Sequence, residues 1–221
     1  GIIALFTACS QAPQSPIDSV DPFIGTGFHG HTYPGATAPY GAVQLSPDTR
    51  KGNWDACSGY HYSDSTLMGF SHTHLSGTGC IDLGDILFRP SLQTPLAFSH
   101  SDEKASPGYY SVNLKEAGVL AELTTTPHVG IHRYTYKKGI ESTLVVDMDH
   151  LLDNEYMYEG WGKRTGDNEL TGMRRTRGWV DNQYVFFVAQ FSQPFSSMEQ
   201  PSERQAVLTF DTTTGKPIVC K

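Results

Sequence analysis

The chain has 221 residues, enough for one β domain whose core needs neither disulfides nor a metal to hold it together. Its 22 glycines and 13 prolines exceed the usual shares of about 7% and 5%, so we expect many turns and β structure rather than helical bundles. With 16 Lys and Arg against 23 Asp and Glu, the net charge of −7 excludes a basic nucleic-acid binder and a polybasic membrane anchor as default interpretations.

The first 17 residues differ from a folded domain. Residues 1–8 are mostly apolar, and the run ends at Thr7, Ala8 and Cys9 as a bacterial lipoprotein signal peptide does. We predict that residues 1–17 are a truncated signal peptide and a flexible tether, and that Cys9 carries a lipid on an exported, periplasmic or outer-membrane lipoprotein. The sequence opens on Gly1 without a basic n-region, so we expect the true beginning of the protein to be missing.

Residues 18–221 are predicted to form one all-β domain, an antiparallel β-sandwich with its strands between residues 18 and 215. Turn pairs such as Pro107-Gly108 and Lys138-Gly139 separate short segments rich in β-branched and aromatic residues, and no segment carries a capped helical stripe. The predicted strands are 42–46, 85–89, 109–114, 119–125, 131–136, 143–147, 174–180, 184–191 and 206–210. Regular strand spacing without intervening helices favours a sandwich or a barrel.

Residues 21–90 are dense in Gly, Pro, His, Ser and Thr, and we predict long structured loops that gather near one end of the sandwich. Two His-x-His pairs lie here, His29 with His31 and His72 with His74. In a strand, such pairs share a face and could chelate a metal. No carboxylate-rich or HExxH context accompanies them, so we favour hydrogen bonding within the loops and assign no metal ligand in this chain.

Trp54 and Asp55 are the strongest candidates for a binding site. Trp54 stands in a Gly-rich loop between Asn53 and Asp55, a poor setting for a core residue. Sugar rings stack their apolar CH faces on aromatic side chains, while their hydroxyls bond to Asp, Asn and His. This pattern predicts a carbohydrate site, but a tryptophan that plugs the end of the sandwich fits the residues equally well.

Cysteine usage is sparse. Apart from Cys9 there are Cys57, Cys80 and Cys220, and no CxxC motif supports a zinc site. Cys57 and Cys80 could pair in an oxidising compartment, or both could be small free thiols. The sequence leaves this choice open.

Several motifs in register resemble the N-terminal region of glycoside hydrolase family 92, the exported bacterial α-mannosidases. The first group is VDPFIGTG at 20–27, HGHTYPGA at 29–36, QLSPDTR at 44–50, GYHYSD at 59–64, GFSHTHLSGTG at 69–79 and DLGD at 82–85. The likeness continues through GYY at 108–110, AELT at 121–124, HRY at 132–134, GW at 178–179 and FSQPF at 191–195. Together they extend over nearly all of residues 18–211.

The resemblance implies a β-sandwich followed by a large (α/α)₆ catalytic domain, calcium dependence, and inverting hydrolysis of α-mannosides in N-glycans or mannan. The family's acid, base and calcium ligands belong to that helical domain, so we expect this chain to be a fragment that is inactive alone. Asp82 and Asp85 are expected to have structural roles. Trp54, Asp55, His31 and His72 are predicted to form one wall of a mannoside pocket.

Two other functions remain possible at this stage. One is a free-standing carbohydrate-binding module on a surface lipoprotein, which predicts a self-contained surface and measurable glycan binding. The other is a metal-dependent enzyme built on the His-x-His loops, which predicts three ligand atoms converging within about 2.0–2.2 Å of one point. The mannosidase-fragment interpretation instead predicts an apolar face on the sandwich, left open where the helical domain would dock.

Overall fold

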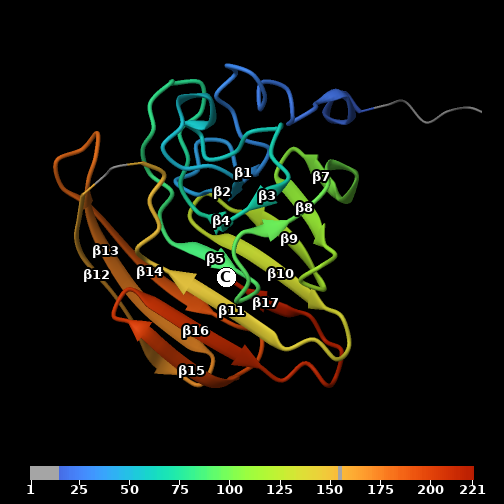
Figure 1. Cartoon of the computed structure of the whole chain (residues 1–221), viewed down its shortest axis with the longest axis vertical. Coiled ribbons are helices and arrows are strands. Elements are labelled where there is room, and N and C mark those ends of the chain that lie inside the picture. Colours follow the sequence, from blue (N-terminus) through green and yellow to red (C-terminus); the bar gives the residue numbers. More distant parts are fainter. Residues whose placement is uncertain (1–14, 154–155) are drawn as a thin grey trace, which may run out of the picture.

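The computed structural model describes residues 15–153 and 156–221, and antiparallel β-strands make up most of it (Figure 1). The largest sheet has seven strands in the spatial order β1-β2-β4-β5-β11-β16-β15. These strands are β1 (Ala36–Thr37), β2 (Gln44–Asp48), β4 (Gly69–Ser71), β5 (Leu87–Arg89), β11 (Ser142–Asp147), β16 (Gln205–Phe210) and β15 (Phe195–Ser202). The predicted all-β antiparallel fold is confirmed.

A second sheet has five strands in the order β17-β10-β9-β8-β7. They are β17 (Ile218–Cys220), β10 (Gly130–Tyr136), β9 (Val119–Thr125), β8 (Tyr109–Leu114) and β7 (Glu103–Ser106). Strand β9 illustrates why these segments fold as they do, because Val119, Ala121 and Leu123 are buried while Glu122 and Thr124 between and beside them are not. Alternation with period two gives such a strand one face for the core and one for solvent.

The core lies between these two sheets. The rings of Phe70 from β4 and Tyr134 from β10 meet across it with centroids 6.4 Å apart. Leu45, Leu144 and Leu208 from the seven-stranded sheet belong to the same buried cluster as the β9 residues. Two inner faces packed in this way form the predicted sandwich.

A third sheet of three strands extends from the sandwich: β12 (Tyr156–Gly166), β13 (Glu169–Arg177) and β14 (Gln183–Gln190). In β14, Val185 and Phe187 pack against the core, while Tyr184 and Phe186 face outward. The remaining pair is β3 (Thr66–Leu67) with β6 (Leu96–Ala97). The helical elements of the described part are short 3-10 turns: η1 (Pro16–Ser19), η2 (Trp54–Ala56) and η3 (His100–Asp102).

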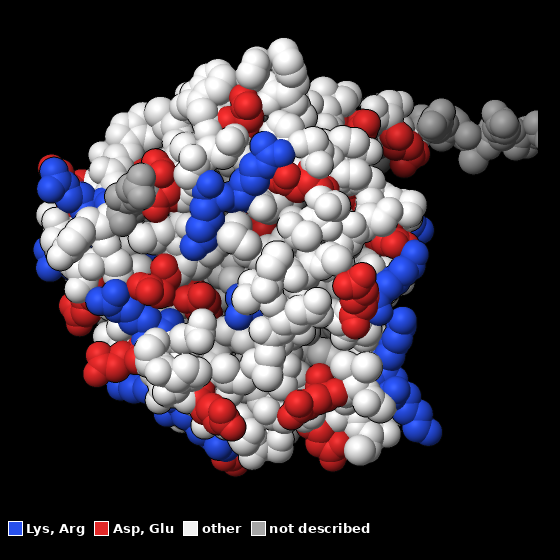
Figure 2. Space-filling view, viewed as in Figure 1, with Lys and Arg blue, Asp and Glu red and all other residues white. Residues whose placement is uncertain are grey.

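The loops of residues 21–80 gather at one end of the molecule, the upper end in Figure 1. Backbone hydrogen bonds tie them together, from Tyr62 N–H to the Thr26 carbonyl and from Gly77 N–H to the His31 carbonyl. Figure 2 shows that acidic and basic side chains are interspersed over the face of the molecule seen in this view. Most of the upper end of that face is uncharged.

The predicted lipid-bearing Cys9 lies outside the described residues, as do the other residues of the predicted signal segment. Pro16 and Ile17, the end of the predicted tether, are exposed in η1. None of the helices in residues 15–153 and 156–221 has the length and apolar character needed to cross a bilayer.

Candidate carbohydrate site

Trp54 stands at the surface of the loop cluster, at the first position of η2. The side-chain Oδ1 of Asn53 accepts a hydrogen bond of 3.0 Å from the Asp55 N–H and caps this turn. The indole is 54% exposed, which is unlike a side chain that plugs a core. A short capped turn therefore holds a large aromatic face toward solvent.

Two histidine rings pack against the indole. The His31 ring meets it edge to face, with centroids 4.2 Å apart, and the His29 ring lies at 5.4 Å. His29 Nδ1 is also paired with the Asp55 carboxylate, and both side chains are partly exposed. The neighbouring Phe28 is 79% exposed and packs on the His29 ring. The structure thus brings Trp54, Asp55 and His31 together as predicted, and it adds His29 and Phe28.

His31 has two features that suit it to bind a ligand. Its backbone adopts a left-handed conformation with φ of 58°, unusual for a residue other than glycine. Its Nε2 is buried and has no hydrogen-bond partner among the described residues. A ligand hydroxyl that reached this nitrogen beside the indole would supply the missing hydrogen bond.

Gly79 lies close against this group. A Cβ built on it would meet Trp54 Nε1 at 3.4 Å and His31 Cε1 at 3.4 Å, and its φ is +64°. The left-handed backbone conformation here favours glycine. This links the GTG segment at 77–79 to Trp54, a contact that the sequence alone does not predict.

His72 belongs to a different part of the molecule. Its Nδ1 lies 2.6 Å from the Ile86 carbonyl, and its Nε2 lies 3.0 Å from Nε2 of His132. Its ring packs on Phe88 in the sheet interior. His72 therefore does not contact Trp54. Because its ring is held inside the sandwich, His72 is not part of the predicted pocket wall.

The His72–His132 contact fixes the tautomers of both rings. His72 Nδ1–H donates to the Ile86 carbonyl, so its Nε2 accepts from His132 Nε2–H, and His132 Nδ1 accepts from the Tyr134 hydroxyl at 2.8 Å. Every polar atom is satisfied with both imidazoles neutral. Burial lowers the pKa of His72, and it lowers the pKa of His132 much further, because charging either ring inside the core is costly.

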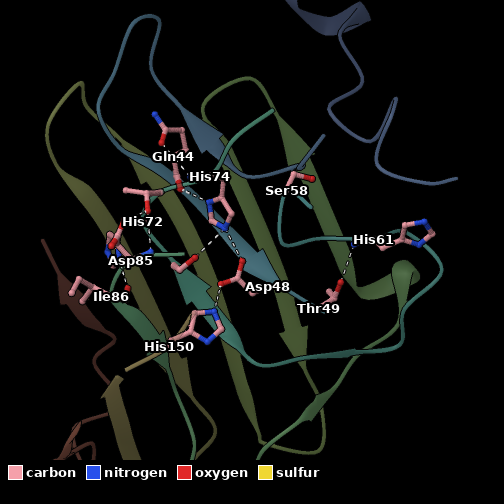
Figure 3. A network of polar contacts seen from close by, with 12 residues as sticks. Gln44, Asp48, Thr49, Ser58, His61, His72, His74, Asp85, Ile86 and His150 are labelled. Carbon is pink, nitrogen blue, oxygen red and sulfur yellow. Dashed lines mark hydrogen bonds and ion pairs between the residues drawn. The ribbon is translucent and has the colours of Figure 1, made fainter. Parts of the chain in front are cut away.

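His74 belongs to a closed network of buried charge (Figure 3). Its Nδ1 lies 2.7 Å from the Gln44 carbonyl and its Nε2 lies 2.6 Å from Oδ1 of Asp48. The second carboxylate oxygen of Asp48 accepts from His150 Nε2 at 2.8 Å. Burial would raise the pKa of Asp48, but the charge on His74 and hydrogen bonds from both histidines outweigh it and hold that pKa well below its usual value.

This network also explains why residue 59 is a glycine, since a Cβ at this position would lie 2.3 Å from Oδ1 of Asp48. Both ring nitrogens of His74 lie within hydrogen-bond distance of oxygen atoms, the Gln44 carbonyl and the Asp48 carboxylate, and the contact with Asp48 is fully buried. The His-x-His pair at 72 and 74 thus serves two separate hydrogen-bond networks. In the described ranges, no group of three or more His, Cys, Asp or Glu side chains could hold a metal ion.

Asp82 and Asp85 have structural contacts. Asp85 is buried, accepts from Thr73 Oγ1 at 2.6 Å, and lies 2.8 Å from Arg174 Nε in a charge contact that is off the line of a hydrogen bond. Asp82 accepts from the Trp179 N–H at 2.7 Å and from the Leu83 N–H at 2.8 Å. Asp82 therefore fixes the backbone of a second exposed tryptophan.

An open cavity of about 580 Å³ lies between Cys80 and Trp179, with Asp153 and Arg177 on its wall. Cys80 directly follows Gly79, so this cavity adjoins the Trp54 group. Trp179 is 67% exposed. The sequence analysis did not propose Trp179 as a binding residue. The signal that could have found it is the turn-forming segment at 178–182, in which Trp179 follows Gly178 and precedes the polar Asp181-Asn182 pair.

Cys57, Cys80 and Cys220 are free thiols in the structure. Cys57 and Cys220 are buried, and Cys80 is exposed. Burial raises the pKa of the Cys57 thiol, so this group is a poor nucleophile.

Comparison with known proteins places this geometry in a family. A family model described as the glycosyl hydrolase family 92 N-terminal domain matches residues 19–221. The structure of the family GH92 α-mannosidase BT3965 from Bacteroides thetaiotaomicron superposes with a TM-score of 0.85 at 34% identity, covering 92% of this chain and 32% of that one. A GH92 family glycosyl hydrolase named ccman5 gives a TM-score of 0.77 at 28% identity, covering 91% and 31%. An uncharacterized secreted glycosidase of Arthroderma benhamiae is 29% identical over 156 residues.

The chain belongs to glycoside hydrolase family 92 and corresponds to its N-terminal domain. It spans about a third of the length of the solved relatives, and 20% of the length of the Arthroderma protein. The resemblance drawn from the sequence motifs is therefore confirmed at the level of family and domain.

Proposed function

We propose that this chain is the substrate-contributing domain of an exported α-mannosidase. The observation that carries the proposal is the exposed Trp54 indole, framed by His31, His29 and the Asp55 carboxylate. An apolar face beside hydrogen-bonding groups matches the two sides of a mannose ring. The family GH92 α-mannosidase BT3965, whose structure was solved with mannoimidazole, supports the choice of sugar.

The reaction that fits best is hydrolysis of an α-mannosidic bond with inversion, in N-glycans or mannan. One carboxyl group protonates the glycosidic oxygen, and a carboxylate roughly 6.5–9.5 Å away takes a proton from the attacking water. We assign both groups to an (α/α)₆ domain that completes the protein, because Asp55 is the one carboxylate that the contacts of the described residues place in the Trp54 group. A solved inverting mannosidase, BT2199 of Bacteroides thetaiotaomicron, shares the fold at a TM-score of 0.76.

Calcium also belongs to the proposed catalytic domain. We assign its ligands there because no group of three or more acidic, His or Cys side chains lies together in the described residues of this chain. The contribution of this chain is to orient the sugar. Trp54 stacks on the ring, and His31 Nε2 and the Asp55 carboxylate bond to its hydroxyls.

We further propose that residues 18–221 form one domain and that residues 1–17 export and tether it, with a lipid on Cys9. The Arthroderma relative, described as a secreted glycosidase, supports export. Replacing Cys9 with alanine should release the full-length protein from membranes and block its lipoprotein processing. Unchanged membrane attachment and processing would overturn the anchor.

Titration with an α-linked mannobiose tests the main proposal. The 221-residue chain should bind it only weakly, with a Kd in the millimolar range or above, because half a pocket buries half the ligand yet bears most of the immobilisation cost. It should not hydrolyse the sugar, whereas the full-length enzyme should. Micromolar binding by this chain alone would favour the free-standing carbohydrate-binding module instead.

A further inference from the structure

Buried groups hold Trp179 in its exposed position. Its side chain is largely exposed, yet its backbone N–H donates a hydrogen bond of 2.7 Å to Oδ2 of Asp82, 97 positions away in the sequence. Asp82 is buried, and its Oδ1 accepts from the Leu83 N–H at 2.8 Å. Carboxylates are seldom buried unless they have a specific partner. Here a buried carboxylate fixes the backbone of an exposed tryptophan.

The same arrangement has two conformational costs. A Cβ on Gly178 would lie 2.4 Å from Oδ1 of Asp82, so only glycine lets the carboxylate come this close to the turn. Leu83 has a φ of 76°, a left-handed conformation that is unfavourable for a residue other than glycine. Such strain is concentrated at functional segments, including ligand-binding ones. An indole that merely covered the surface would need neither feature, so both favour a role that depends on the position of Trp179.

The open cavity of about 580 Å³ beside Trp179 has the size of a ligand site, for which about 300–1,000 Å³ is usual. Tyr156 and Arg177 line it together with Trp179, and these two residues pair where β12 begins and β13 ends. Tyr156 is also largely exposed. The cavity therefore has two aromatic side chains that a ligand can reach, and the end of a β-ladder supports its wall.

The charged groups that line the cavity favour a neutral ligand. Arg177 brings one positive charge and Asp153 one negative charge, while the Asp82 carboxylate is bound to two backbone N–H groups. Arg177 Nε lies 3.5 Å from Oδ1 of Asp181, and both side chains are largely exposed, so the guanidinium can turn to a ligand. Stacking faces beside one donor and one acceptor group suit a sugar, whereas a phosphate or an acidic sugar would need excess positive charge.

We propose that this cavity is a second sugar subsite, which binds a further unit of a neutral α-mannoside of three or more units. The inference rests on the proposed function and adds the length of the substrate. Gly79 lies against Trp54 and Cys80 lines the cavity, so the two sites adjoin. A mannobiose has one unit on each side of the bond that is cleaved, and the reaction centre and Trp54 take both. A third or fourth unit continues past Gly79 and Cys80 to Trp179.

Indole NMR signals of the 221-residue chain test the binding directly. The chain has three tryptophans, Trp54, Trp161 and Trp179, so three single substitutions by phenylalanine assign the three indole N–H signals. Titration with a linear α-linked mannotetraose should shift the signals of Trp54 and Trp179. Trp161 does not line this cavity, and its signal is the internal control. A Trp179 signal that stays in place, or that moves no more than the Trp161 signal, would overturn the subsite. A shift of Trp179 without one of Trp54 would support the subsite and contradict the proposed Trp54 site.

Kinetics of the full-length enzyme supply a second readout. Trp179→Ala should lower kcat/KM for mannotetraose by about three- to tenfold more than kcat/KM for mannobiose, the effect expected for one aromatic contact. Trp179→Phe should restore part of the difference. Val180→Ala, at the next exposed residue of the turn, is the matched control and should leave both values unchanged. Equal losses on the two sugars would overturn the subsite, because Trp179 would then pack within the protein, and so would unchanged kinetics on mannotetraose. Trp54→Ala should lower both values, so a failure of the Trp54 site is recognised separately.

Discussion

The Asp48 network and the Trp54 group use the same kinds of side chain for opposite purposes. Around Asp48, two histidines and a carboxylate are buried and satisfy one another. Around Trp54, two histidines and a carboxylate surround an exposed indole, and one ring nitrogen has no partner. Residue type therefore does not distinguish a scaffold from a site in this chain. Exposure and an unsatisfied polar atom do.

The largest expected effect is on stability, and it distinguishes the Asp48 carboxylate from the Asp55 carboxylate. Asp48→Ala should lower the free energy of unfolding by about 3–5 kcal/mol, because it removes the buried carboxylate that both His74 and His150 contact. Asp55→Ala is the matched control. Its pair with His29 is partly exposed, so the free energy of unfolding should change by no more than about 0.5 kcal/mol. Chemical denaturation of both variants at pH 7.5 measures the difference, and similar losses would contradict the comparison.

The next effect is on the pH dependence of stability. Burial depresses the pKa values of His72, His132 and His150 in the folded state, so the unfolded chain binds more protons as pH falls below about 6.5. Stability should therefore be full near pH 8 and decrease below about pH 6.5, by up to about 1.4 kcal/mol per pH unit for each such histidine. Asp48 adds a separate loss below about pH 4, where its carboxylate is protonated in the unfolded chain.

Urea denaturation between pH 8 and 5 measures this slope. His29→Gln, at a partly exposed ring, should leave the slope unchanged. His132→Gln should reduce it, although the substitution lowers stability at every pH. A slope insensitive to His132 would show that the neutral histidine pair is not its source.

The sequence was a good guide to the strands with clean alternation and a poor guide to those without it. Strands β8, β9 and β10 match their predictions within a residue. Strand β12 was missed because its glycines and charged residues obscure the period, and β15 because most of its residues are polar and exposed. The short strands β1, β3 and β6 have only two residues each, too few to carry a pattern.

For the site, the sequence pointed to Trp54, Asp55 and His31 but misplaced His72. The local pattern around His72 resembles that around His31, since each begins or ends a His-x-His pair in a Gly-rich loop. What separates them is the pairing of β4 with β5, which turns His72 toward Ile86 and His132. The contact between His72 and His132 joins residues 60 positions apart, so it depends on sheet topology, which local sequence spacing does not encode.

A smaller effect distinguishes the site by activity instead of stability. In the full-length enzyme, Trp54→Ala should lower kcat/KM by about tenfold, since stacking on an aromatic face is worth about 0.5–1.5 kcal/mol beyond area burial. If the stacking is equal in the ground and transition states, KM rises and kcat stays nearly constant. Trp54→Phe should restore part of the loss. Tyr40→Ala, at a fully exposed aromatic residue, should have no effect. Unchanged kinetics in Trp54→Ala would leave the indole without a role in binding.

The smallest expected effect on activity comes from Gly79, which connects the backbone of the loop cluster to the indole. Gly79→Ala forces a side chain into a left-handed conformation, at a cost of about 1–2 kcal/mol in the free energy of unfolding. The new methyl would lie 3.4 Å from both Trp54 Nε1 and His31, an ordinary contact, so the indole should keep its position. Stability should therefore fall by this amount, while kcat/KM of the full-length enzyme changes less than in Trp54→Ala. Gly77→Ala is the matched control, because its φ of +71° carries the same strain with nothing within 4 Å of the added methyl. Equal stability losses in the two variants, with kinetics close to wild type, would attribute the glycine to backbone conformation alone. A much larger kinetic loss in Gly79→Ala would show instead that the sugar approaches this backbone as closely as the indole does.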